Sequence, residues 1–134
     1  MKITEIPVET GERYQLVSIT DEVKRAVREA GVGEGMCIIS STHTTAAVTV
    51  NEDYDRNVPG DLAAAARAFL GAMDVRFDHA EGNSDSHFLT SLFGQSQTLL
   101  VRGGEVALGR WQGVFLAEFD GPRRRTVTVA VGEM

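Results

Sequence analysis

The sequence has 134 residues, 43% of them hydrophobic, and a formal net charge of −6, which suits one domain with its own hydrophobic core. No apolar run approaches the roughly 18 residues of a membrane span, and so acidic a chain argues against the basic face with which nucleic-acid binders neutralise phosphates. The opening residues MKITEIPVET lack the basic and apolar blocks of a signal peptide, so we expect a cytoplasmic protein with neither nucleic acid nor membrane as partner.

The first 31 residues predict two strands and a helix. Lys2–Val8 shows weak apolar alternation, and its proline confines it to the edge of a sheet. Tyr14–Ile19 is a stronger strand because aromatic and β-branched residues dominate it. Thr20 is a candidate N-cap for an amphipathic helix over about 21–30, which Gly31 would end.

The middle of the chain predicts two buried strands and a second helix. The strands are Met36–Ser40 and Ala46–Val50, and the connection between them places His43 at the mouth of a strand. After Pro59 and Gly60, Asp61 is expected to cap a helix that ends at Gly71. Its expected buried face consists of Leu62, Ala65, Ala66, Phe69 and Leu70.

A third helix and four strands are predicted for the remainder. The helix spans about Ser84–Phe93, with Asn83 or Ser84 as its N-cap and Gly94 after its end. Its expected buried stripe is Phe88, Leu89, Leu92 and Phe93. The strands are Thr98–Val101, Val106–Leu108, Val114–Glu118 and Thr126–Val131.

This order of elements favours one α+β domain over residues 1–134, with about three helices and a mainly antiparallel sheet or sandwich. Strict alternation of strand and helix, which would indicate a doubly wound fold, is missing. The sequence also contains neither a GxGxxG fingerprint nor a GK[ST] phosphate loop.

The three histidines of the chain, His43, His79 and His87, all lie in polar, turn-like sequence. Three imidazoles and a water are a common ligand set for zinc, because the open position can take a substrate oxygen. The glycine between His79 and His87 lets the chain fold back and bring these two residues together. His43 would have to come from another element to complete the site. The alternatives are separate hydrogen-bonded turn histidines, or acid/base chemistry without metal in which Asp78 or Asp85 orients an imidazole.

Two further groups are candidate binding residues. Asn51, Glu52 and Asp53 follow a predicted strand, where they would orient the histidines, bind Mg²⁺ or simply form a solvated acidic loop. Trp111 and Gln112 would supply an apolar wall and an amide for a planar ligand, unless the tryptophan packs in the core.

The arginines near the C-terminus form another candidate group. Arg123 and Arg125 are candidates for binding phosphate, and pairing with acidic residues is the alternative. The Asp120-Gly121-Pro122 segment directly before Arg123 is also typical of a plain turn.

Several motifs in order resemble the YjbQ family, also called UPF0047. They are HTTA at 43–46, Asn51-Glu52, Asp61, His79, Asn83 with His87 four residues on, SLFG at 91–94, LG.WQG at 108–113 and E.DGPR.R at 118–125. The similarity runs from the end of the first helix to the start of the last strand. One departure is Ser86, where the family pattern leads us to expect alanine.

The resemblance implies a compact α+β fold that assembles as a homotrimer, with the histidines and acidic residues near subunit boundaries. It also implies a weak, secondary thiamine-phosphate synthase activity, which joins hydroxymethylpyrimidine diphosphate to a thiazole phosphate. Displacing diphosphate requires charge neutralisation by Mg²⁺ or arginines, for which Glu52, Asp53, Arg123 and Arg125 are available. The chain lacks a dedicated phosphate cradle, so we interpret the synthase activity as a side reaction.

The leading hypothesis is an enzyme that binds a small phosphorylated molecule with the help of a divalent metal, zinc by preference. His43, His79 and His87 would hold the metal, and the candidate catalytic residues are His43, Glu52, Asn83 and Glu118. The candidate ligand-binding residues are Thr44, Thr45, Asn51, Trp111, Gln112, Arg123 and Arg125. The rivals are a non-catalytic metal- or ligand-binding trimer and a metal-dependent hydrolase, which would use the same residues.

Overall fold

The computed structural model describes residues 1–79 and 81–134, and these residues form three helices and eight strands. The helices are α1 (Thr20–Ala30), α2 (Asn57–Gly71) and α3 (Ser84–Phe93). The strands are β1 (Lys2–Glu9), β2 (Gln15–Ser18), β3 (Glu34–Ser41), β4 (Ala46–Glu52), β5 (Ser96–Arg102), β6 (Glu105–Val106), β7 (Gln112–Glu118) and β8 (Arg124–Glu133). The predicted α+β class is confirmed.

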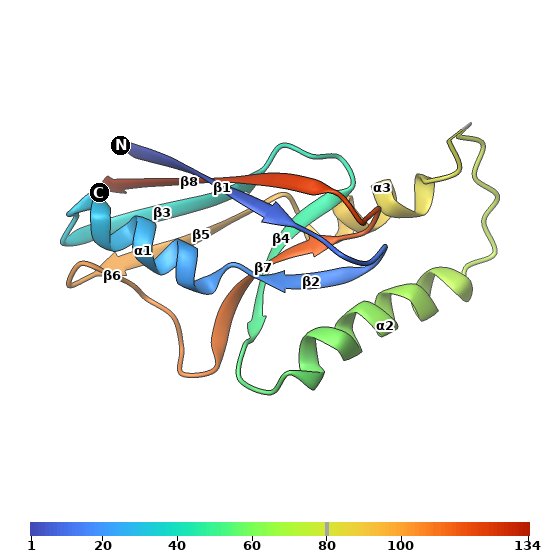
Figure 1. Ribbon diagram of the computed structural model, residues 1–134, viewed down its shortest axis with the longest axis horizontal. Helices are drawn as coiled ribbons and strands as arrows, with labels where there is room; N and C mark the ends of the chain where they lie inside the picture. The colour runs from blue at the N-terminus through green and yellow to red at the C-terminus, as the bar shows by residue number, and fades with distance from the viewer. Residues whose placement is uncertain (80) are drawn as a thin grey trace.

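The strands form two antiparallel sheets. The larger sheet has the order β1-β8-β3-β5-β6, and the smaller sheet has the order β2-β7-β4. As expected, β1 lies at an edge of its sheet. The two early strands belong to different sheets: β1 is in the larger sheet and β2 is in the smaller one, and the chain crosses between the sheets after β1 (Figure 1).

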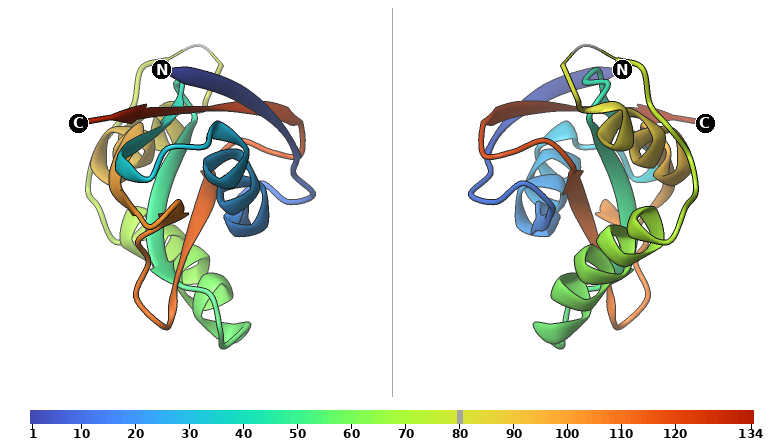
Figure 2. Two further views of the ribbon diagram at one scale, coloured as in Figure 1. Left: turned by 90° about the vertical axis from the view of Figure 1, so that its left-hand side faces the viewer. Right: turned by 90° about the vertical axis from the view of Figure 1, so that its right-hand side faces the viewer.

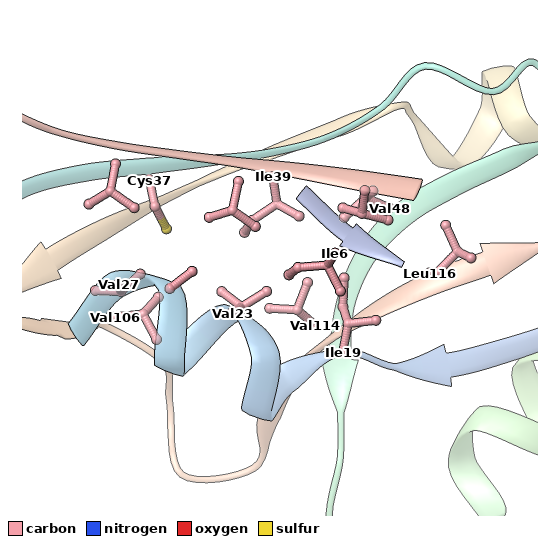
Figure 3. Packing of buried hydrophobic residues seen from close by; sticks show 14 of the residues in the cluster. Ile6, Ile19, Val23, Val27, Cys37, Ile39, Val48, Val106, Val114 and Leu116 are labelled. Carbon is pink, nitrogen blue, oxygen red and sulfur yellow. The ribbon is translucent and has the colours of Figure 1, made fainter. Parts of the chain in front are cut away.

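The smaller sheet is buried on both of its faces. Leu116 of β7 belongs to the same hydrophobic cluster as Val23 of α1 and Ile39 of the larger sheet, and Figure 3 shows this cluster extending between α1 and the strands above it. The neighbouring Phe115 packs in a second cluster with Leu89 of α3 and other residues of α2 and β2. Successive strand residues point to opposite faces, so β7 serves two cores. Figure 2 shows its strands between α1 on one side and α2 with α3 on the other.

Helix α2 begins earlier than predicted. It starts at Asn57, which makes Asp61 a residue of the second turn rather than the N-cap. Pro59 is tolerated because amides of the first helical turn have no partner within the helix. Among the expected buried residues Ala66 is buried, but Ala65 and Phe69 are exposed. The helix therefore covers the smaller sheet with a narrower face than its apolar content suggests.

Helix α3 has the predicted bounds and ends before Gly94. Leu89 is fully buried, whereas Leu92 is 59% exposed and Phe88 is exposed as well. The hydroxyl of Ser86 donates to the carbonyl of Phe119 (2.6 Å) and ties α3 to the end of β7. The serine at this position thus has a structural role that alanine would lack. No helix in the described part of the chain is both long and apolar enough to cross a bilayer.

Thr20 is the first residue of α1, and Ile19 occupies the cap position. The Thr20 hydroxyl forms hydrogen bonds with Asp53 and with the carbonyl of Val114 instead of capping the helix. The left-handed Gly31, with φ of 70°, ends the helix as predicted.

Candidate functional site

His79 and His87 face each other across the turn that precedes α3. Gly82 adopts a φ of 72°, and its amide donates to the carbonyl of His79 (3.1 Å), so the chain reverses direction there. The two imidazole centroids lie 5.6 Å apart, with ring planes at 81°. The prediction that the glycine allows the chain to fold back is confirmed.

The two histidines line an open cleft of about 350 Å³ together with Thr44, Thr45, Asn83 and Arg123. Asn83 donates its amide Nδ2 to Oδ2 of Asp120 (2.9 Å), which fixes the orientation of the side chain. Its Oδ1 is buried and has no hydrogen-bond partner among the described residues. A buried acceptor without a donor is costly, so this oxygen would be stabilised by a donor brought within its reach.

Arg123 is held at the cleft by Asp120. Its Nε donates to the Asp120 carbonyl (2.9 Å), and its terminal nitrogen donates to Oδ2 (3.0 Å). An arginine has five N–H donors, and this side chain remains half exposed. The guanidinium is therefore fixed in place while it keeps donors for a ligand. Asp120, which fixes both Asn83 and Arg123, was missed as a site residue although it lies within the E.DGPR.R motif.

His43 lies in an adjoining cleft of about 260 Å³ that also includes His87. The amide of Thr126 donates to His43 Nε2 (3.0 Å). A neutral imidazole has one lone pair and one N–H, so this bond leaves Nδ1 as the hydrogen-bond donor. The prediction that His43 is a metal ligand does not fit this arrangement, because the lone pair of Nε2 already accepts a hydrogen bond from the Thr126 amide.

The predicted three-histidine metal site is not assembled within one chain. Among the described residues, no three or more histidine, cysteine, aspartate or glutamate side chains are grouped so that they could hold a metal ion. The carboxylates predicted to orient an imidazole also lie elsewhere. Asp85 accepts hydrogen bonds from Arg13 and Tyr14, and Asp78 pairs with Arg76. Glu81 is the carboxylate beside a histidine, with Oε2 3.8 Å from His79 Nε2.

Glu118 and Arg125 form a buried ion pair beneath the cleft. Arg125 is 3% exposed and Glu118 0%, and both arginine nitrogens that face the carboxylate donate to it. Arg125 also donates to Thr45 Oγ1 (2.8 Å), while Thr10 donates to Glu118 Oε1 (2.7 Å). Both side chains are enclosed by protein in the described chain, and the pair has a structural role because it fixes Thr45 from below.

Ionisation of Glu118 is favoured by this network. Burial alone would raise the pKa of the carboxyl, but hydrogen bonds from Arg125, Thr10 and the Asp120 amide, together with the charge of Arg125, lower it below its usual value. The pair is thus charged at neutral pH and fully enclosed by protein.

The residues predicted around Asn51 and Trp111 lie at the opposite end of the smaller sheet. Ala46, beside the histidine loop, and Glu52 are at the two ends of β4, about 20 Å apart for a strand of this length. Glu52 pairs with Gln112 across the sheet. Within one chain, Glu52 therefore does not orient the histidines, because strand β4 separates them.

This distant end has contacts of its own. Trp111 packs edge-on against Tyr54, with centroids 4.6 Å apart, and the Arg110 guanidinium lies 4.7 Å from the Trp111 ring centroid. Asp53 accepts hydrogen bonds from Ser18 and Thr20. The tryptophan is exposed and not part of the core, whereas Asp53 ties β4 to the start of α1.

We expect His43 to take up a proton only at a pH below the ordinary histidine pKa. Burial and the nearby charge of Arg125 lower the pKa of His43, and protonation of Nε2 would break its bond with the Thr126 amide. In the unfolded chain His43 takes up this proton at about pH 6.5. The stabilising contribution of neutral His43 is therefore complete above that pH and is lost as the pH falls through the lower pKa of the folded state.

An NMR titration of the histidine Hε1 resonances measures this effect. We expect the His43 midpoint below 6.5, with the Thr126 amide resonance changing at the same midpoint. A His43 midpoint at or above 6.5, or an unresponsive Thr126 amide, would contradict this arrangement.

Comparison with known proteins gives a consistent picture. The sequence profile of the family described as "UPF0047 protein YjbQ-like" matches residues 4–133. A UPF0047 protein of Methanocaldococcus jannaschii is 43% identical over 92% of this chain and 89% of its own length, and UPF0047 protein YugU of Bacillus subtilis is 36% identical over 90% and 92%. The crystal structure of a YjbQ/UPF0047 protein from Clostridium acetobutylicum superposes with a TM-score of 0.91, at 39% identity over 96% of this chain and 99% of that one.

Proposed function

The chain belongs to the UPF0047 YjbQ-like family, and we propose that it is a metal-assisted enzyme that acts on a small phosphorylated molecule in the cleft of His79 and His87. The observation that carries this proposal is the facing histidine pair in a cleft that also presents Arg123. Imidazole nitrogens are good ligands for a divalent transition metal, and a fixed guanidinium is suited to a phosphate.

The spacing of the histidine rings fits a shared metal. Two imidazoles that bind one tetrahedral zinc ion have ring centroids roughly 5 Å apart, close to the 5.6 Å separation of His79 and His87. Nitrogen donors favour zinc over magnesium. Mg²⁺ that accompanies a diphosphate substrate would be bound mainly by the phosphate oxygens. The remaining zinc positions would be filled by water, by the substrate or by a second copy of the chain.

Other side chains near this pair would orient the substrate. Asn83 Oδ1 has no hydrogen-bond partner among the described residues, and a small displacement of the side chain that brings it to the cleft surface would let it accept from a substrate hydroxyl or amine. His43 would donate from Nδ1 to a substrate oxygen that extends into the adjoining cleft. Arg123 would bind the phosphate, and the metal would supply further positive charge against the phosphoryl group.

Replacing Arg123 with glutamine is expected to weaken binding of a phosphorylated ligand by about ten-fold or more, since hydrogen bonds to charged groups contribute about 1.5–3 kcal/mol. Inorganic phosphate titrated into zinc-loaded protein and followed at the His87 ring resonances measures this change. The control is Arg124→Gln, because that neighbouring side chain is exposed and pairs with Glu9 instead. Equal weakening in both variants, or in neither, would refute the role of Arg123.

A weak thiamine-phosphate synthase activity is proposed as a side reaction of this cleft. The cleft offers one fixed guanidinium rather than a surrounding phosphate cradle, which is consistent with low turnover. Conversion of hydroxymethylpyrimidine diphosphate and thiazole phosphate by the purified protein tests the activity, and loss of that conversion in Arg123→Gln would assign it to the cleft. Ligand and zinc binding without turnover of any phosphorylated substrate would instead support a non-catalytic binding protein.

A homotrimer is proposed as the assembled form. Large apolar side chains are exposed close to the site, including Phe88 and Leu92 on α3, the helix that carries His87. Covering such side chains is a common reason for subunits to associate. Sedimentation equilibrium of the purified chain gives the number of copies directly.

A further inference from the structure

A separate cavity, of about 320 Å³, lies between β2 and α2. It shares no lining residue with the two histidine clefts. Figure 1 shows α2 below β2 and α3 above it. Its wall on the β2 side includes Tyr14 and Gln15, and its wall on the α2 side runs from Arg56 to Arg67.

The shape of this cavity follows from the sequence of α2. Arg56 and Arg67 are eleven residues apart, so they lie roughly 20° apart around the helix and about 16 Å apart along it. Between them the cavity is lined by Gly60, Ala63 and Ala64. These small side chains leave room for a groove between two longer cationic residues. Ala63 and Ala64 therefore line an open space rather than a helix contact.

Neither arginine has a carboxylate partner among the described residues. Six of the eleven arginines of this acidic chain form ion pairs there, but Arg56 and Arg67 do not. The Arg67 guanidinium lies 5.3 Å from the centroid of the Tyr14 ring, so the ring helps to fix it beside the cavity. Glu12 also lines the cavity but is not within ion-pair distance of either guanidinium.

We propose that this cavity is a second ligand site for a small, elongated dianion whose two acidic groups bind Arg56 and Arg67. Guanidinium groups bind carboxylates and phosphates in the same bidentate manner, and the apolar floor of glycine and alanine suits a short methylene chain between them. The site goes beyond the proposed reaction, since none of its residues belongs to the histidine clefts.

Three probes differ in the number and the kind of their acidic groups. Adipate carries carboxylates at both ends of four methylenes, butane-1,4-diphosphonate carries phosphonates on the same linker, and hexanoate has one acidic end. Titrations at constant ionic strength are followed by NMR at the Tyr14 ring for this cavity and at the His79 and His87 rings for the other cleft.

We expect adipate or the diphosphonate to bind at least about ten-fold more tightly than hexanoate, with saturable shifts of the Tyr14 ring. Whichever of the two binds better identifies the acidic group. Arg56→Gln and Arg67→Gln should each weaken binding by about ten-fold or more. The control Arg102→Gln removes an exposed arginine outside this cavity and should leave the affinity unchanged.

Hexanoate binding as tightly as both dianions, or equal losses in all three variants, would overturn the proposal. So would saturable binding that shifts only the histidine rings. Because Arg123→Gln affects the histidine cleft alone, failure of this site and failure of the proposed function give different results.

Discussion

Replacing Arg125 with alanine is expected to lower the free energy of unfolding by about 3–5 kcal/mol, which is the usual cost of leaving a buried charge without its partner. The arginine and Glu118 are almost completely enclosed. The variant would leave the Glu118 carboxylate with hydrogen bonds from Thr10 and the Asp120 amide but without a positive charge. Urea denaturation at pH 7 measures the loss.

Arg124→Ala is the matched control, because this adjacent side chain on β8 is 76% exposed and its partner Glu9 is exposed as well. Exposed pairs contribute about 0–1 kcal/mol. Equal losses in the two variants would contradict the assigned burial. If Arg125→Ala fails to fold, the double variant Glu118→Leu with Arg125→Met should restore folding, since apolar side chains replace both charges. A double variant as unstable as Arg125→Ala would also refute the explanation.

The loss in Arg125→Ala should also depend on pH. The pKa of Glu118 is lowered in the folded protein, so its contribution to stability is present above the unfolded value of about 4.3 and disappears as pH falls through the folded value. The difference between wild type and Arg125→Ala should therefore decrease in acid.

Replacing His87 with alanine is expected to reduce zinc affinity by about two orders of magnitude or more. Even side chains that only orient metal ligands contribute 10–100-fold to affinity, and His87 is one of two proposed ligands. Phosphorylated-substrate turnover should be lost with the metal. Competition with a fluorescent zinc chelator measures the affinity, and circular dichroism establishes that α3 remains folded.

His43→Ala separates this arrangement from a three-histidine site. The Nε2 lone pair of His43 is engaged by the Thr126 amide, so removing this ring should change zinc affinity by less than about three-fold while it impairs turnover. A loss as large as that of His87→Ala would restore His43 as a metal ligand. Unchanged zinc affinity in His87→Ala would exclude the histidine pair as the metal site.

The sequence was most informative where local chemistry dominates. Gly31 and Gly94 end helices as expected. The continuous apolar run of β7 and the alternating valines of β8 are buried, as expected for strands. Helix α2 was harder to place, because Pro59 is a plausible interruption before a helix and is equally acceptable within its first turn.

The candidate site shows a different limit of sequence reasoning. Motif order placed His79, Asn83 and His87 in one cleft, since they are close along the chain and share one turn. It also grouped Glu52 with them, yet the length of β4 keeps Glu52 at the far end of the sheet. The roles of Arg123 and Arg125 diverge because Glu118 draws one guanidinium into the interior. A tertiary contact of this kind leaves no periodic signal in the sequence.

The most direct measurement is a zinc titration of ¹⁵N-labelled protein, observed at the ring nitrogens of all three histidines. We expect His79 and His87 each to show one nitrogen shifted by metal binding, while His43 keeps a protonated Nδ1 and an Nε2 that accepts from Thr126. Metal-induced shifts at His43, or none at His79 and His87 with saturating zinc, would contradict this expectation.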